Sequence, residues 1–165
     1  MRNIVWILLA CLVLAVAGCC GDDDDVIIPG GGNTAVIPSQ TTDTDTGGAA
    51  YTIPANTTVT SNSVVNGQIT FGFGTCPTAA VEAFAGTVYG TAQFTPIDAV
   101  FSSPVTLVIP VTGATGTVSI YRWNGTTWES AGSGTVGTDS VEFTSTHFGC
   151  FLVGALHSEG GGGDL

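Results

Sequence analysis

Basic residues are almost absent from this sequence. The 165-residue chain has no lysine and only two arginines, Arg2 and Arg122, against 13 acidic residues, and its formal net charge is −11. A protein that binds nucleic acid needs a basic face. A helix that lies on an anionic membrane surface needs one as well. The sequence therefore excludes a nucleic-acid-binding protein and a basic helix that lies on an anionic membrane.

Charged residues of either sign are also scarce, at 9% of the chain, against roughly 25% in typical soluble domains. Leu, Lys, Gln and Arg are few while Thr, Val and Gly are abundant, which argues against a helical bundle. The chain has no Cys-x-x-Cys pair, no Gly-rich phosphate loop and no Gly-x-Ser-x-Gly elbow. We therefore expect no enzyme, no metal and no cofactor.

The first residues have the layout of a secretory signal. A short positive start is followed by an uncharged apolar run over residues 4–17, which is shorter than the about 20 residues of a membrane-spanning helix. Leu14-Ala15-Val16-Ala17-Gly18-Cys19 then resembles the bacterial lipobox, in which small residues precede a lipid-bearing cysteine. The resemblance implies a signal peptide over residues 1–18. It also implies a diacylglyceryl group and palmitate on Cys19, which would anchor the chain to a membrane.

The residue after Cys19 bears on localisation. In the lipoproteins that this motif resembles, aspartate at that position favours inner-membrane retention, whereas this chain has Cys20. The resemblance therefore implies a lipid-anchored protein of the outer membrane. Asp22–Asp25 is similar to the acidic clusters that direct some lipoproteins to the cell surface, and the alternative is a solvated spacer.

Composition divides the remaining chain into three parts. Residues 19–50 are rich in Gly, Thr and Asp and have little apolar surface to bury, so we expect a disordered acidic tether. Residues 51–157 are long enough for one domain with a hydrophobic core. Residues 158–165 form a Gly-rich tail, which we expect to be flexible.

The domain has the pattern of a β protein. Short β-branched and aromatic runs are separated by turn residues, and Asn66-Gly67 and Asn124-Gly125 predict two-residue type I′ hairpins. The Ala-rich stretch Thr78–Ala85 is compatible with a short helix. We predict an all-β fold, a single antiparallel β-sandwich. The predicted strands are Thr57–Thr60, Gln68–Phe73, Thr87–Phe94, Val105–Ile109, Thr117–Trp123, Thr126–Ser130, Ser140–Thr144 and Cys150–Val153.

Three blocks carry a resemblance to a known domain. They are AVFSSPVTLVIP (99–110), VSIYRWNGTTW (118–128) and THFGCFLV (146–153). Their order resembles the β-sandwich domain of zonula-occludens proteins, netrin receptors, ankyrins and bacterial surface proteins. Some members of that family cleave themselves at His-Phe-Ser. Here Gly149 follows His147-Phe148 and has no nucleophile, so we expect no self-cleavage and a hydrogen-bonded structural role for His147.

Three cysteines remain once the signal is removed and Cys19 carries lipid. In the oxidising compartment that a secretory signal implies, Cys76 and Cys150 are the natural disulfide pair because both lie in the domain. Their bridge would close a loop of about 75 residues, worth roughly 4 kcal/mol. Cys20 is left free, pairs between chains or lies near the lipid.

The hairpin Tyr121–Trp128 is the best candidate for a binding surface. A two-residue turn would place Tyr121, Trp123 and Trp128 on one face, with Trp123 opposite Thr126 and Tyr121 opposite Trp128. Either this face is an exposed platform for a glycan or protein ligand, or it is core. In the second case Arg122 would form a diagonal surface pair with Glu129. We favour partial burial of the aromatic side chains.

These observations predict a non-catalytic lipoprotein of the cell envelope that presents a β-sandwich as a structural or interaction module on an acidic tether. The alternative is an adhesion module that binds a glycan or protein partner through the Tyr121–Trp128 hairpin. A self-cleaving domain is the least favoured reading because Gly149 lacks the hydroxyl that such a reaction needs.

Overall fold

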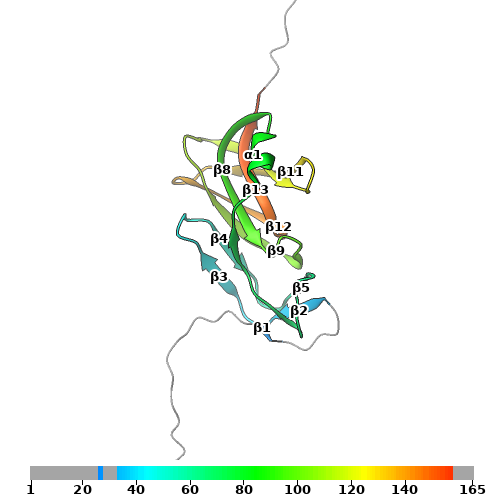
Figure 1. Cartoon of the computed structure of the whole chain (residues 1–165). Coiled ribbons are helices and arrows are strands. Elements are labelled where there is room, and N and C mark those ends of the chain that lie inside the picture. The colour runs from blue at the N-terminus through cyan, green and yellow to red at the C-terminus, as the bar shows by residue number, and fades with distance from the viewer. Residues whose placement is uncertain (1–25, 28–32, 158–165) are drawn as a thin grey trace, which may run out of the picture.

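The described part of the chain is a β-sandwich. The computed structural model describes residues 26–27 and 33–157 (Figure 1). One antiparallel sheet has the strand order β11-β10-β13-β8-β7. Its strands are β7 (Gly72–Gly74), β8 (Gly86–Thr95), β10 (Thr117–Trp123), β11 (Trp128–Thr135) and β13 (Gly149–Leu156).

The opposing sheet has the order β2-β5-β9-β4-β3, and β12 also pairs with β9. Its strands are β2 (Thr34–Ile37), β3 (Thr41–Thr44), β4 (Ala50–Ile53), β5 (Thr57–Thr60), β9 (Val100–Pro110) and β12 (Ser140–His147). A small separate ladder joins β1 (Val26–Ile27) to β6 (Gln68–Ile69). The predicted all-β sandwich is confirmed.

The hydrophobic core lies between the two sheets. On β9, Val105, Leu107 and Ile109 are fully buried and alternate with partly exposed residues, as a strand with one face inside requires. Phe94 and Phe148 are buried in the same core, with ring centroids 5.6 Å apart. Burial of these apolar side chains is the main favourable contribution to folding.

The sandwich begins earlier in the chain than the sequence predicts. Residues 34–44 and 50–60 are the two arms of one antiparallel hairpin, here called the long hairpin, because the register of β2 with β5 continues into that of β3 with β4. The second arm pairs with β9. The disordered tether expected over residues 19–50 is therefore wrong for residues 34–50, and the domain does not begin at residue 51.

The polar composition of residues 34–44 explains why the predicted start of the domain is wrong. The first arm of the long hairpin is rich in threonine, which is polar but β-branched and therefore favours strands. Ala35 and Ile37 point into the core at alternate positions and are 2% and 0% exposed. Two inward apolar residues in a four-residue strand are enough to attach it to the sheet, although the segment as a whole is polar.

Two prolines interrupt the long hairpin, and an aspartate closes the turn at its tip. Pro38 and Pro54 lie between its paired segments, where the missing proline N–H breaks the ladder. At the tip, one oxygen of the Asp45 carboxylate accepts hydrogen bonds from the backbone N–H groups of Gly47 and Ala49, each at 2.8 Å. This side chain closes the turn in the way expected of aspartate.

Most of the predicted elements are present. The strands predicted at Thr57–Thr60 and Thr117–Trp123 have these bounds in the structure, whereas the predicted strand Gln68–Phe73 is divided between β6 and β7. Asn66-Gly67 forms the predicted two-residue turn, with φ angles of 53° and 77°. The Ala-rich stretch forms helix α1 (Thr78–Glu82).

The connection between β8 and β9 is tied to the loop after β5. Ser61 donates its hydroxyl to Asp98 Oδ1 at 2.6 Å, and the backbone N–H of Asn62 donates to Asp98 Oδ2 at 2.7 Å. The hydrogen bond from Ser61 is the main reason why the pKa of Asp98 lies below its ordinary value; partial burial opposes this effect.

Helix α1 and the start of the sandwich lie at opposite ends. Figure 1 shows α1 beside β8, β13 and β11 at one end, and β1, β2 and β5 at the other. The chain therefore enters the sandwich far from α1. Any surface that α1 helps to form lies at the opposite end from this entry point.

Candidate functional site

The aromatic side chains of the β10–β11 hairpin lie on the outer face of their sheet. Val118 and Ile120 of β10 are buried in the core, so the alternate residues Tyr121 and Trp123 point outward. Trp128 of β11 pairs directly with Trp123, and their ring centroids are 5.4 Å apart. The structure thus brings the three predicted aromatic residues together.

The hairpin register differs from the predicted one. The loop has four residues, 124–127, and Arg122 lies opposite Glu129 instead of diagonal to it. Asn124 explains the longer loop because its side-chain oxygen accepts the backbone N–H groups of Thr126 at 2.9 Å and Thr127 at 2.8 Å. Between Tyr121 and Trp123 the pairing shifts by two residues, which leaves the three aromatic side chains on their expected face.

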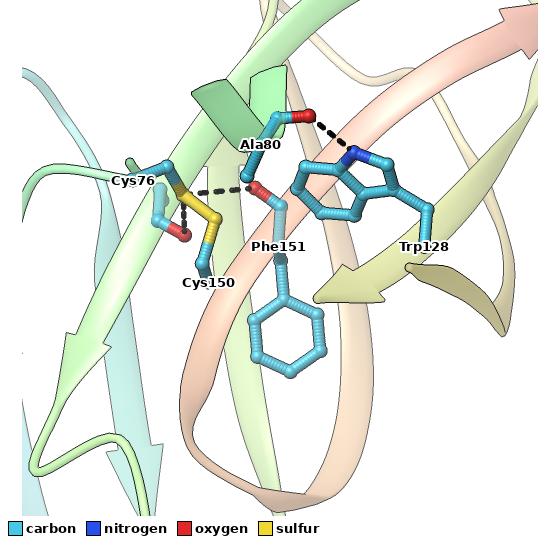
Figure 2. The surroundings of a disulfide bond; sticks show 6 residues. Cys76, Ala80, Trp128, Cys150 and Phe151 are labelled. Atoms are coloured by element: carbon cyan, nitrogen blue, oxygen red, sulfur yellow. Dashed lines mark hydrogen bonds between the residues drawn. A yellow bond between two sulfur atoms is a disulfide. The ribbon is translucent and has the colours of Figure 1, made fainter. Parts of the chain in front are cut away.

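Helix α1 covers part of this aromatic face. The indole N–H of Trp128 donates to the backbone oxygen of Ala80 at 2.7 Å (Figure 2). Phe84, just after the helix, packs on Tyr121 with ring centroids 4.9 Å apart. Tyr121, Trp123 and Trp128 are all half-buried. The expected partial burial of the aromatic side chains is confirmed, and α1 is its cause.

A disulfide fastens the segment that leads into α1. Cys76 and Cys150 are bonded, with their Cα atoms 5.3 Å apart, as the sequence predicts. Figure 2 shows the bridge on one side of Ala80 and Trp128 on the other. The Cys76 sulfur also lies 3.5 Å from the backbone oxygen of Ala92; because a disulfide sulfur carries no proton, this is a packing contact.

A hollow of about 320 Å³ remains between the hairpin and the end of α1. We call it the aromatic hollow; its lining includes Phe84, Tyr121, Trp123, Thr127, Trp128 and Leu156. Among the residues that the structure describes, no charged side chain lines it. Its volume lies near the lower end of the about 300–1,000 Å³ typical of ligand pockets, which are mostly apolar with a few polar groups.

Another cavity, of about 370 Å³, lies on the other face of β10 and β11. We call it the polar cavity. Arg122 and Glu129 line it, with Nη2 and Oε2 3.9 Å apart, a separation at which exposed pairs contribute at most about 1 kcal/mol. His147 lies at the same cavity. Burial lowers the pKa of its imidazole, and the positive charge of Arg122 lowers that pKa further.

The segment that resembles a self-cleavage site forms the corner between β12 and β13. The hydroxyl of Thr146 and His147 Nδ1 are 3.0 Å apart, so His147 is hydrogen-bonded, as expected. Phe148 is buried in the core. Gly149 has a φ of 146°, a conformation that favours glycine over residues with a side chain.

Several predicted features lie outside the described residues. These are the lipobox Leu14–Cys19, the lipidation site Cys19, Cys20, and the tail 158–165. Within the described ranges, no three His, Cys, Asp or Glu side chains form a group that could hold a metal ion. No helix in these ranges is long and apolar enough to cross a membrane.

Sequence reasoning missed the residues that α1 adds to the site. Phe84 lines the aromatic hollow from 37 residues before Tyr121, and the backbone oxygen of Ala80 holds the Trp128 side chain that forms part of its wall. The available signal was the short helix-compatible stretch Thr78–Ala85, which begins two residues after a cysteine that pairs with β13.

The aromatic hollow is thus the part of the described structure best suited to hold a ligand. Comparison with known proteins gives no precedent for it: no protein-family model matches the chain, and no curated protein matches it either.

Proposed function

We propose that this protein is a non-catalytic, lipid-anchored component of the cell envelope that presents its β-sandwich as an interaction module. The observation that carries the proposal is the aromatic hollow, in which Trp123 and Trp128 are only half-buried although the core beneath them is complete. Half-buried aromatic residues around a hollow are typical of surfaces that bind a partner.

The sequence supports the anchor. The lipobox Leu14–Cys19 resembles those that guide diacylglyceryl and palmitoyl groups onto the cysteine, and multiple acyl chains hold a protein stably on a membrane. With Cys20 in place of an aspartate, the proposed location is the outer membrane, with exposure at the cell surface. Figure 1 shows α1 and β11 at the end of the sandwich away from β1 and β2, where the chain enters. Because Trp128 of β11 and Phe84 after α1 line the aromatic hollow, the hollow would face away from the membrane.

Glycan binding is the second candidate and concerns the same hollow. Aromatic faces pack against the C–H faces of sugar rings, while hydroxyl groups such as those of Thr126 and Thr127 can bond to sugar hydroxyls. A protein partner is the other ligand that this surface would fit.

Co-sedimentation with isolated cell envelopes tests the proposed binding role. Residues 20–165, purified without the proposed signal and lipid-bearing cysteine so that no acyl chain holds them on the membrane, should sediment with envelopes. Trp123→Ala in the same chain should reduce the bound fraction at least fivefold while the far-UV spectrum of the folded chain is retained. Val65→Ala is the control, since it truncates an exposed apolar side chain far along the chain from the hairpin. Equal sedimentation of all three proteins would contradict the proposal.

The anchor has a separate test. Cells that express the chain should incorporate labelled palmitate into it, and Cys19→Ala should abolish the label. Protease treatment of intact cells should remove the sandwich if it is displayed at the surface. Incorporation of palmitate by the Cys19→Ala chain would contradict lipidation at this cysteine.

A further inference from the structure

Trp123 lies between two hollows. On one side it lines the aromatic hollow, and on the other it lines a second hollow of about 190 Å³, together with Pro77, Gln93, Ile97 and Asn124. The four-residue loop 124–127 contributes to both. The two hollows are therefore neighbours along the surface, and the Trp123 side chain is their common wall.

The second hollow extends the site along α1. Pro77, which precedes the helix, lines the second hollow, while Ala83 and Phe84, which follow it, line the aromatic hollow. The hydrogen bond from Trp128 to Ala80 fixes the helix between them. Figure 2 shows the disulfide on one side of Ala80 and Trp128 on the other, and Cys150 of that disulfide lines the second hollow. The two hollows adjoin at Trp123, and together they are called the groove.

Within the described part of the chain, no charged side chain lines either hollow. The polar groups are amides and hydroxyls, and the side chain of Gln93 has no hydrogen-bond partner among the described residues, which leaves it able to bond to a ligand. Seven acidic residues lie within residues 33–157 against the single cation Arg122, so the domain repels acidic ligands. Both observations favour a neutral ligand.

Size favours an extended ligand. The aromatic hollow lies near the bottom of the about 300–1,000 Å³ range of ligand pockets and the second hollow lies below it, so neither alone would enclose much of a ligand. A chain of rings that crosses the flat side chain of Trp123 would occupy both. Each hollow also offers an exposed apolar side chain: Ile97, 63% exposed, lines the second hollow, and Leu156, 58% exposed, lines the aromatic hollow.

We propose that this groove binds a neutral, linear oligosaccharide that spans both hollows, with Trp123 as the central stacking surface. The inference rests on the proposed binding role of the aromatic hollow and adds the class of ligand, its neutrality and a requirement for more than one ring. Gln93 acts as a binding residue for the part of the chain that lies beyond Trp123.

Calorimetric titration of the full-length chain tests this inference. The probes are linear chains of β-linked glucose and of β-linked N-acetylglucosamine with one to six rings, and uronic acid chains of matched length. For at least one neutral series, affinity should rise at least tenfold between one ring and four rings. It should exceed the affinity for the matched acidic chains at least tenfold.

Variants locate the two halves of the groove. The double change Gln93→Ala/Ile97→Ala should weaken binding of four-ring chains about fivefold and leave that of the shortest bound chain unchanged. Val65→Ala is the matched control for Ile97→Ala, because Val65 is 64% exposed and lies in neither hollow. Trp123→Ala should abolish binding of every length, and Trp123→Phe, which keeps an aromatic ring, should retain part of it.

Each alternative result overturns the inference. An affinity independent of chain length, or equal for neutral and acidic chains, removes the extended neutral ligand. If no probe binds but Trp123→Ala still reduces envelope binding, the glycan inference fails while the proposed function stands. If envelope binding is also insensitive to Trp123→Ala, both fail together.

Discussion

At the residue scale, Trp128 fastens helix α1 to the sheet. Its indole N–H reaches the backbone oxygen of Ala80, a residue that is 1% exposed, so this carbonyl has little access to water. Because an unsatisfied buried polar group costs more than the bond itself contributes, the pair matters more than its single hydrogen bond suggests. The same contact sets one wall of the aromatic hollow.

Trp128→Phe tests this fastening. The substitution keeps an aromatic ring but removes the donor, and we expect it to lower the free energy of unfolding by about 1–2 kcal/mol. Trp123→Phe is the matched control, since the Trp123 indole N–H has no hydrogen-bond partner among the described residues. Urea denaturation measures both, and equal losses for the two variants would contradict the role of the Ala80 contact.

Asp98 predicts a dependence of stability on acid pH. Its folded-state pKa lies below its ordinary value of 3.8, so folding favours the ionised carboxylate. The resulting stability is complete above the ordinary pKa and is lost as the pH falls through the lowered folded-state pKa. Urea midpoints should therefore decrease less in Asp98→Asn than in the wild type between about pH 5 and about pH 2.

A control is needed for the change in net charge. Glu142→Gln removes an exposed carboxylate on β12, away from Ser61 and Asn62. Its acid dependence should follow the wild type more closely than that of Asp98→Asn. If both variants flatten the curve equally, the hydrogen bonds to Asp98 are not the cause.

At the element scale, the long hairpin is the largest departure from the sequence prediction. Ile37 of β2 is fully buried, whereas its neighbour Val36 points to the other face and is partly exposed. Ile37→Ala should therefore cost about 2–5 kcal/mol of unfolding free energy, and Val36→Ala, the control, about 1 kcal/mol or less. Equal and negligible effects in urea denaturation would mean that this segment behaves as the tether first expected.

Removal of the disulfide should lower stability and loosen helix α1. Cys76→Ala/Cys150→Ala removes a cross-link between residues 74 apart, and the chain-entropy model gives a loss of about 4 kcal/mol. Because the bridge holds the start of α1, quenching of tryptophan fluorescence by acrylamide should increase in the folded variant. Cys20→Ala is the control, and an unchanged quenching constant in the double variant would show that α1 stays in place without the bridge.

The sequence predicts strands best where one face is continuously apolar. β10 has the predicted bounds because Val118 and Ile120 alternate with outward residues, and the same alternation places Trp123 on the correct face. The hairpin loop was mispredicted because the Asn124 side chain bonds to Thr126 and Thr127 and stabilises a longer loop than Asn-Gly alone suggests. The part of the site made by α1 depends on a contact between distant segments, which no local pattern encodes.

At the scale of the whole molecule, the acidity is shared between the sandwich and the chain that precedes it. Four of the 13 acids are Asp22–Asp25 and seven lie within residues 33–157. The extension of the sandwich to residue 34 therefore moves Asp43 and Asp45 from the supposed tether into the folded domain, where Asp45 closes a turn. The proposed tether is correspondingly shorter, so the sandwich would lie closer to the membrane than the sequence first suggested.

The point where the chain enters and the proposed binding groove lie at opposite ends of the sandwich. The chain enters at β1 and β2, and α1 lies at the opposite end (Figure 1). The groove is lined by residues on either side of α1. A lipid at Cys19 would thus hold one end of the sandwich near the membrane and leave the groove free for a ligand. This arrangement connects the proposed anchor with the proposed binding role.

The binding surface can be located directly by mapping where a ligand touches the sandwich. Amide and indole NMR signals of the full-length chain would be followed during titration with a soluble extract of cell envelopes. We predict the largest shifts at the Trp123 indole and the backbone of residues 124–127. Shifts centred instead on the polar cavity of Arg122 and His147, with the Trp123 signals unmoved, would contradict the central claim that the aromatic hollow is the binding surface.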